Sequence, residues 1–128
     1  MHIVQPSVGL SVKHLLGPVD GLLEIGQIRL VDIGQRRVLL VRSGSGDYYA
    51  LRHLCAHQGV DLSAGRLTGR LKSLNVGEYE YVDDFESLRC PRHGYQYDVR
   101  SGQTWFDTRV RIKTYVVTVY KGELWVDL

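Results

Sequence analysis

Two short clips of cysteine and histidine constrain this chain more than any other feature of its sequence. The first clip is Cys55-x-His57 and the second is Cys90-x-x-His93. The chain has only two cysteines, and each has a histidine two or three positions later. Two thiolates and two imidazoles suit a near-tetrahedral site that takes sulfur and nitrogen ligands, so the fold is expected to bring both clips to one point.

Zinc and an iron-sulfur cluster both fit this donor set. A zinc finger usually takes its two cysteines from one clip and its two histidines from another, whereas here each clip supplies one of each. That division suits a two-iron centre in which the cysteines hold one iron and the histidines hold the other. Two alternatives need no metal: ordinary buried cysteines, or a cysteine nucleophile with a histidine base, which leaves the second clip unexplained.

The residues around the clips resemble the Rieske 2Fe-2S family. Residues 58–59 (Gln-Gly) continue the first clip, and residues 94–98 (Gly-Tyr-Gln-Tyr-Asp) and 101–102 (Ser-Gly) continue the second. The resemblance covers residues 22–128 and implies a Rieske-type 2Fe-2S cluster, bound where two loops form one tip of the fold. The ligands that it implies are Cys55, His57, Cys90 and His93.

The rest of the sequence predicts an all-β fold. Residues 27–32 and 37–42 are apolar, β-branched runs joined by a glycine-containing turn, which is typical of a hairpin. A terminal hairpin is predicted where residues 114–120 and 123–126 flank Lys121-Gly122. No segment has a sustained 3.6-residue period. We therefore expect an antiparallel β-sandwich or barrel-like body, which is the fold that the Rieske resemblance implies.

A single domain over residues 1–128 accounts for the chain in this interpretation. Its length allows one core without disulfide support, and 44% hydrophobic with 23% charged residues is typical of a globular protein. The cluster-binding loops are expected at about residues 53–62 and 88–98. Between them, a basic segment and an acidic segment predict an inserted hairpin at about residues 66–86, in which opposite charges pair across the strands.

Charge and hydropathy exclude several classes of function. A net charge of +2 is too small to indicate nucleic-acid binding. No apolar run approaches the ~20 residues needed to cross a bilayer, and residues 1–16 lack the pattern of a secretory signal. With both cysteines assigned to the cluster, none remains for a disulfide, which fits a reducing compartment. We expect a cytoplasmic protein that binds neither nucleic acid nor membrane.

Electron transfer is the expected function, because a 2Fe-2S centre changes by one electron. A Rieske oxygenase also needs a mononuclear iron held by two histidines and a carboxylate, and only His2, His14 and His53 remain for it. The resemblance is therefore to a stand-alone ferredoxin of the oxygenase-associated type. Such a carrier is not an enzyme by itself and passes electrons from a flavin-dependent reductase to a terminal oxygenase or a similar redox protein.

Two alternative functions stay open at this point. One is a small Rieske-like subunit of a multi-subunit reductase such as nitrite reductase, in which the domain serves assembly as much as electron transfer. The other is a zinc-bound interaction module. The colour of the purified protein separates the two metals, because a Rieske centre is red-brown and zinc is colourless.

Four residues beside the clips carry further expectations. Rieske proteins of respiratory cytochrome bc complexes have, where this chain has Tyr95, a serine that bonds a bridging sulfur, so the resemblance implies a potential in the lower part of the Rieske range. Tyr97 is expected either to donate to the Cys55 sulfur, as the family's pattern suggests, or to pack at the cluster's edge. Arg52 and Arg92 either form a positive rim for an acidic partner or are simply solvated.

Overall fold

The computed structural model describes residues 12–56, 59–92, 95–104, 107 and 109–128, with the backbone alone at 70–74. Ten strands and one short 3-10 helix, η1, lie in these ranges. They are, in chain order, β1 (Lys13–Pro18), β2 (Ile28–Ile33), β3 (Arg36–Arg42), β4 (Tyr48–Arg52), η1 (Leu62–Ala64), β5 (Arg66–Asn75), β6 (Glu78–Arg89), β7 (Gln96–Asp98), β8 (Thr114–Tyr115), β9 (Val117–Tyr120) and β10 (Glu123–Asp127).

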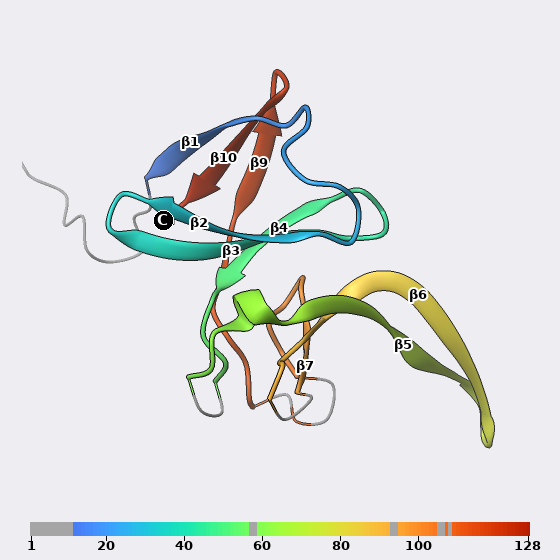
Figure 1. Cartoon of the computed structure of the whole chain (residues 1–128). Coiled ribbons are helices and arrows are strands. Elements are labelled where there is room, and N and C mark those ends of the chain that lie inside the picture. The colour runs from blue at the N-terminus through green and yellow to red at the C-terminus, as the bar shows by residue number, and fades with distance from the viewer. Residues whose placement is uncertain (1–11, 57–58, 93–94, 105–106, 108) are drawn as a thin grey trace, which may run out of the picture.

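Three antiparallel sheets make up the fold, which confirms the predicted all-β class (Figure 1). Their strand orders are β1-β10-β9, β2-β3-β4-β8 and β5-β6-β7. In Figure 1 the first two sheets form the upper body, and the third lies below them beside the loops that carry the two clips. Among the described residues, no helix has the length and apolar character needed to span a membrane.

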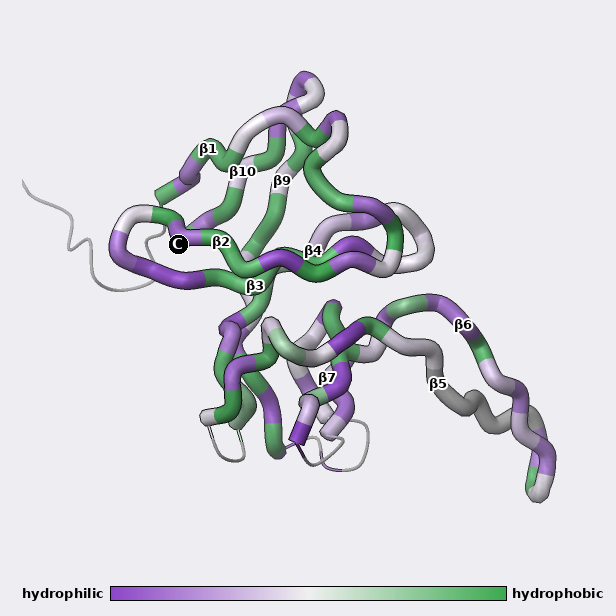
Figure 2. The backbone as a smooth tube through the Cα atoms, viewed as in Figure 1, coloured by the Kyte–Doolittle hydropathy of each residue, from purple (hydrophilic) through white to green (hydrophobic). Residues whose placement is uncertain are grey.

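The central strand β3 is buried on both faces. Its run from Val38 to Val41 is fully buried, and such a continuous apolar run is typical of a strand covered on two sides. One face lies in the core between the first two sheets, the sandwich core, whose buried members are Leu23, Ile33, Val38, Leu40, Ala50, Leu124 and Val126. The other face lies in a loop-side core of Leu39, Val41, Leu51, Cys55, Leu62, Leu67, Leu88, Cys90, Tyr97, Val99 and Ile112. Figure 2 shows hydrophobic stretches along strands of both body sheets.

The first and the terminal hairpin predicted from the sequence are present, with one correction. β2 pairs with β3, and β9 pairs with β10 around Lys121-Gly122. The segment 114–120, expected as one strand, is divided at Val116: β8 pairs with β4, whereas β9 pairs with β10 in another sheet. The Val116 carbonyl accepts from Asp127 N at 2.9 Å. An apolar run has the same strand propensity on both sides of such a crossing, so its pattern does not reveal the change of partner.

The hairpin of β5 and β6, here called the arm, extends away from the body (Figure 1). Its register runs from Arg66 opposite Arg89 to Asn75 opposite Glu78, with a shift next to Gly69. A Cβ added at Gly69 would lie 2.1 Å from the Val82 carbonyl oxygen, so this irregular crossing requires glycine. The sequence predicts this hairpin as an insertion between the two cluster-binding loops, and that part of the interpretation stays a prediction.

Candidate metal centre

Both clips lie in loops of the same construction. The Cys55 N–H donates to the Val60 carbonyl at 2.8 Å, and the Cys90 N–H donates to the Tyr95 carbonyl at 2.7 Å. Each bond closes a loop from the cysteine to the fifth residue after it, and each clip's histidine position falls inside that segment. The two clips, 35 positions apart by their cysteine numbers, therefore share the same closing backbone hydrogen bond.

The two cysteines are delivered by strands and buried in one core. Cys90 directly follows β6, and Cys55 comes three residues after the end of β4. Their exposed fractions are 4% for Cys55 and 2% for Cys90, and neither is in a disulfide. Both belong to the loop-side core. Two cysteines outside any disulfide in one buried cluster suit a shared sulfur-ligated metal site.

Tyr97 connects the first clip to β7. Its hydroxyl lies 2.9 Å from the Cys55 sulfur and accepts from the Ala56 N–H at 3.1 Å. Burial is the main cause that raises the pKa of Tyr97, followed by its hydrogen bond to Cys55; the charge of Cys90 contributes as well. The expected contact between Tyr97 and the Cys55 sulfur is therefore present, and either group can be its donor.

The described residues supply the sulfur half of the predicted ligand set. Cys55 and Cys90 lie near one buried phenol, while His57 and His93 fall outside the residues that the structure describes. Within the described ranges, no three His, Cys, Asp or Glu side chains form a group able to hold a metal ion. The chemistry of the two cysteine thiols fits the cysteine-bound side of a cluster. The full set of four ligands stays a prediction.

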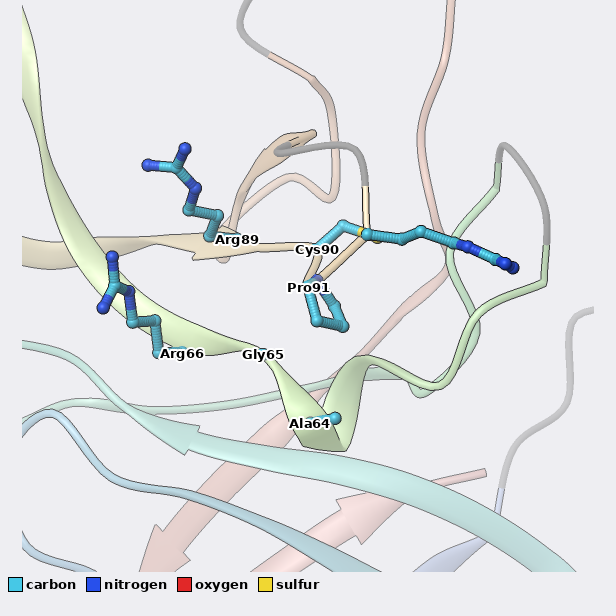
Figure 3. Close-up of a pocket in the computed structure, with 7 residues that line it drawn as sticks. Ala64, Gly65, Arg66, Arg89, Cys90 and Pro91 are labelled. Carbon is cyan, nitrogen blue, oxygen red and sulfur yellow. The ribbon is translucent and has the colours of Figure 1, made fainter.

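A hollow of about 650 Å³ lies beside the second clip, and we call it the arginine hollow (Figure 3). Its lining residues are Ala64, Gly65, Arg66, Arg89, Cys90, Pro91 and Arg92. The sequence pattern indicates Arg92 as a rim residue but not Arg66 and Arg89, which lie opposite each other across β5 and β6. These two arginines are 23 positions apart by number, and only the cross-strand register brings them together. Arg52, the other expected rim residue, does not line this hollow.

Comparison with known proteins identifies the family. The family model described as "Rieske [2Fe-2S] domain" matches residues 15–116. The ferredoxin component of the alkene monooxygenase system of Xanthobacter autotrophicus is 28% identical over 106 residues, which are 83% of this chain and 73% of that protein. Human apoptosis-inducing factor 3 is 36% identical over 81 residues, which are 62% of this chain. The chain spans about a tenth of the length of the apoptosis-inducing factor 3 proteins of human and mouse.

Solved structures agree on the fold. A protein described as an NADH-dependent nitrite reductase small subunit from Mycobacterium tuberculosis has a TM-score of 0.70 at 19% identity, over 93% of this chain and 96% of that one. The ferredoxin of carbazole 1,9a-dioxygenase from Nocardioides aromaticivorans IC177 has a TM-score of 0.67 at 24% identity, over 91% of this chain and 97% of that one. The family whose model matches this chain is defined by a Rieske-type 2Fe-2S cluster. By the family match over residues 15–116, the chain belongs to the Rieske [2Fe-2S] domain family.

Proposed function

We propose that the four residues of the two clips hold the cluster, namely Cys55, His57, Cys90 and His93. The observation that carries this assignment is that Cys55 and Cys90 are both buried in the loop-side core, and that each donates its N–H to the carbonyl of the fifth residue after it. The cysteines would hold one iron and the histidines the other, as in Rieske centres. When bound there, the cluster supplies one-electron redox chemistry.

The chain's own residues set the conditions around that cluster. The loop-side core keeps water away from the two cysteine sulfurs, because both side chains are almost fully buried. The Tyr97 hydroxyl accepts from the Ala56 N–H, and it would donate to the Cys55 sulfur once that sulfur is ligated as a thiolate, which cannot donate. Hydrogen bonds of this kind tune a metal site by stabilising charge on its sulfur ligands.

We further propose that the chain passes electrons in the cytoplasm from a flavin-dependent reductase to an oxygenase, without being an enzyme by itself. The relative from Xanthobacter autotrophicus, described as the ferredoxin component of an alkene monooxygenase system, supports this role over most of both chains. A further likeness supports it: a ferredoxin solved in complex with the oxygenase of carbazole 1,9a-dioxygenase has a TM-score of 0.66.

A second candidate function is the small subunit of a multi-subunit reductase. The nitrite reductase small subunit from Mycobacterium tuberculosis favours it, with a TM-score of 0.70 over nearly the whole of both chains. The two functions differ in how long the partner stays bound. A carrier exchanges partners between electron transfers, whereas a subunit stays in a stoichiometric complex with its reductase.

Metal analysis tests the ligand assignment. We expect purified protein to contain two irons and two acid-labile sulfides per chain, with a rhombic EPR signal after reduction. Cys55→Ser and Cys90→Ser should both lose the cluster, while Tyr97→Phe should keep it because the phenol is not a ligand. One tightly bound zinc per chain in place of iron would overturn the assignment.

Reconstitution tests the role. The chemically reduced protein is mixed with an alkene monooxygenase or carbazole dioxygenase system from which the native ferredoxin has been left out. Substrate turnover above a control with apo-protein would support the carrier function. No turnover in either system, together with co-elution of the chain and a reductase as one stable complex, would favour the subunit function instead.

A further inference from the structure

We propose that the arginine hollow is an electron-exchange surface that receives an acidic patch of a redox protein, so that electrons pass on the Cys90 side of the cluster. This inference rests on the proposed function, because it requires a cluster held by Cys90. Three arginines line the hollow and no carboxylate does, within the described residues. The excess of positive charge therefore lies directly beside a proposed ligand.

The three guanidinium groups are not neutralised within the described part of the chain. Arg66, Arg89 and Arg92 are exposed, and none forms an ion pair or side-chain hydrogen bond with another described residue. By contrast, Arg37 and Arg109 are also exposed but each pairs with a carboxylate. The positive charge of the hollow is thus available to a group from outside.

Cross-strand register places two of these charges against each other. Arg66 lies directly opposite Arg89, and like charges in that position destabilise a sheet. This unfavourable pair lies at the end of the arm next to Cys90. A negatively charged patch from another protein would relieve this repulsion.

The backbone keeps this pair close. A Cβ added at Gly65 would lie 2.1 Å from the carbonyl oxygen of Arg89, and the Gly65 N–H donates to Leu62 at the start of η1 at 2.9 Å. The chain leaving η1 therefore passes directly against the end of β6. Figure 3 shows the side chains of Arg66 and Arg89 rising from the two strands in the same direction, with Pro91 beside Cys90.

The chemistry of the hollow favours a protein surface over a small anion. A small-anion site needs convergent donors held in place by their neighbours, and the three exposed arginines have no such support. Attraction of an acidic surface needs only complementary charge. The exposed apolar side chains of Ala64 and Pro91 also line the hollow, which suits contact with a protein. No bond forms or breaks in the exchange: one electron passes between the cluster and the redox centre of the partner.

Voltammetry of the cluster-loaded protein tests this inference, with a carboxylate-terminated monolayer on gold as the acidic surface. The test variant is Arg66→Glu/Arg89→Glu, which leaves all four proposed ligands in place and retains a like-charge pair across the strands. The matched control is Arg29→Glu/Arg36→Glu, on β2 and β3, whose arginines are exposed and do not line the hollow. Both variants change the formal net charge from +2 to −2.

We expect the test variant to exchange electrons with the carboxylate surface about tenfold more slowly than the control at low ionic strength. High salt should remove most of this difference, and an ammonium-terminated monolayer should reverse it. Equal rates for the two variants, both with full iron content, would overturn the inference and leave the ligand assignment intact. Absence of iron from the unaltered protein would instead contradict the proposed function.

Two further measurements separate a loss of charge attraction from poor iron binding and from a small-anion site. If the test variant binds too little iron, Arg66→Gln/Arg89→Gln replaces it, and the expected slowing is smaller but has the same sign. Inorganic phosphate, compared with chloride at the same ionic strength, tests for a small-anion site. Phosphate that specifically stops exchange with the carboxylate surface would overturn the assignment to an acidic protein patch, and equal effects of the two anions would support it.

Discussion

The hydroxyl of Tyr97 lies 2.9 Å from the sulfur of Cys55, although 42 positions separate the two residues. The Ala56 N–H donates to the same hydroxyl at 3.1 Å, so the phenol is held between the first clip and its sulfur. Because Tyr97 is fully buried, water does not replace this contact. A substitution that removes only the hydroxyl therefore isolates its effect on the cluster.

Tyr97→Phe should lower the midpoint potential of the cluster. A hydrogen bond to a ligand sulfur favours the more negative reduced state. A difference of about 1 kcal/mol between the two redox states corresponds to roughly 40 mV for a one-electron couple. Protein-film voltammetry of the two proteins at equal iron content measures the shift. An unchanged or raised midpoint would mean that the hydroxyl does not act on the redox-active sulfur.

The potential gap between the unaltered protein and Tyr97→Phe should be independent of pH up to about 10. Burial raises the pKa of Tyr97 above its ordinary value of 10.0. A raised pKa means that the folded state favours the protonated phenol. The effect of the phenol on the cluster is therefore complete below the ordinary pKa of tyrosine, and it is lost only as pH rises through the higher pKa of the folded protein. The same voltammetry over a pH series checks this, and a gap that closes near pH 7 would contradict it.

The midpoint potential at pH 7 should lie nearer ~−150 mV than ~+300 mV, the two ends of the Rieske range. Tyr95 stands where the higher-potential proteins of respiratory complexes carry a serine, and its large ring does not place a hydroxyl where that short side chain does. Its backbone carbonyl accepts from the Cys90 N–H and so serves the loop itself. A midpoint above zero would indicate additional hydrogen bonds to the cluster.

Gly65→Ala should destabilise the fold by about 1–3 kcal/mol. The added Cβ would lie 2.1 Å from the carbonyl oxygen of Arg89, whereas the φ angle of −83° suits any residue. Gly77→Ala is the matched comparison, because Gly77 has φ +79° and no atom within 4 Å of an added Cβ. It should cost about 1 kcal/mol from backbone strain alone. Urea unfolding separates the two, and a larger cost at Gly77 would contradict the close approach at Gly65.

Arg100→Ala should cost more stability than Arg37→Ala, although both side chains are 56% exposed. The partner of Arg100 is Glu86, whose side chain is 10% exposed, while the partner of Arg37 is Asp32, at 66%. Removing Arg100 leaves a largely buried carboxylate unpaired. We expect Arg100→Ala to lower the stability by about 2 kcal/mol, less than the roughly 3–5 kcal/mol lost when a fully buried pair is broken. Arg37→Ala should lower it by at most ~1 kcal/mol. Equal costs in urea unfolding would show that the burial of Glu86 does not matter.

Local patterns were enough to predict several of the strands and the two clips. The runs that became β2, β3 and β10 have apolar residues and turn signals in short windows, and Cys55 and Cys90 each have a histidine close by. Contacts between distant segments were not predictable in this way. The division at Val116 and the pairing of Arg66 with Arg89 depend on which strand becomes the neighbour, and nothing near those residues encodes it. The contact of Tyr97 was expected only through the family resemblance.

The double burial of β3 means that the loops and the sandwich do not melt separately. Residues 38–41 place alternate side chains in the two cores, so neither core can lose its packing without exposing one face of this strand. Cluster binding stabilises the folded state by mass action. Because both cores share β3, this added stability applies to the whole domain and not to the loops alone. The apo-protein is then not an intact sandwich with loose loops, but a molecule closer to global unfolding at every position, with one cooperative transition at a lower temperature.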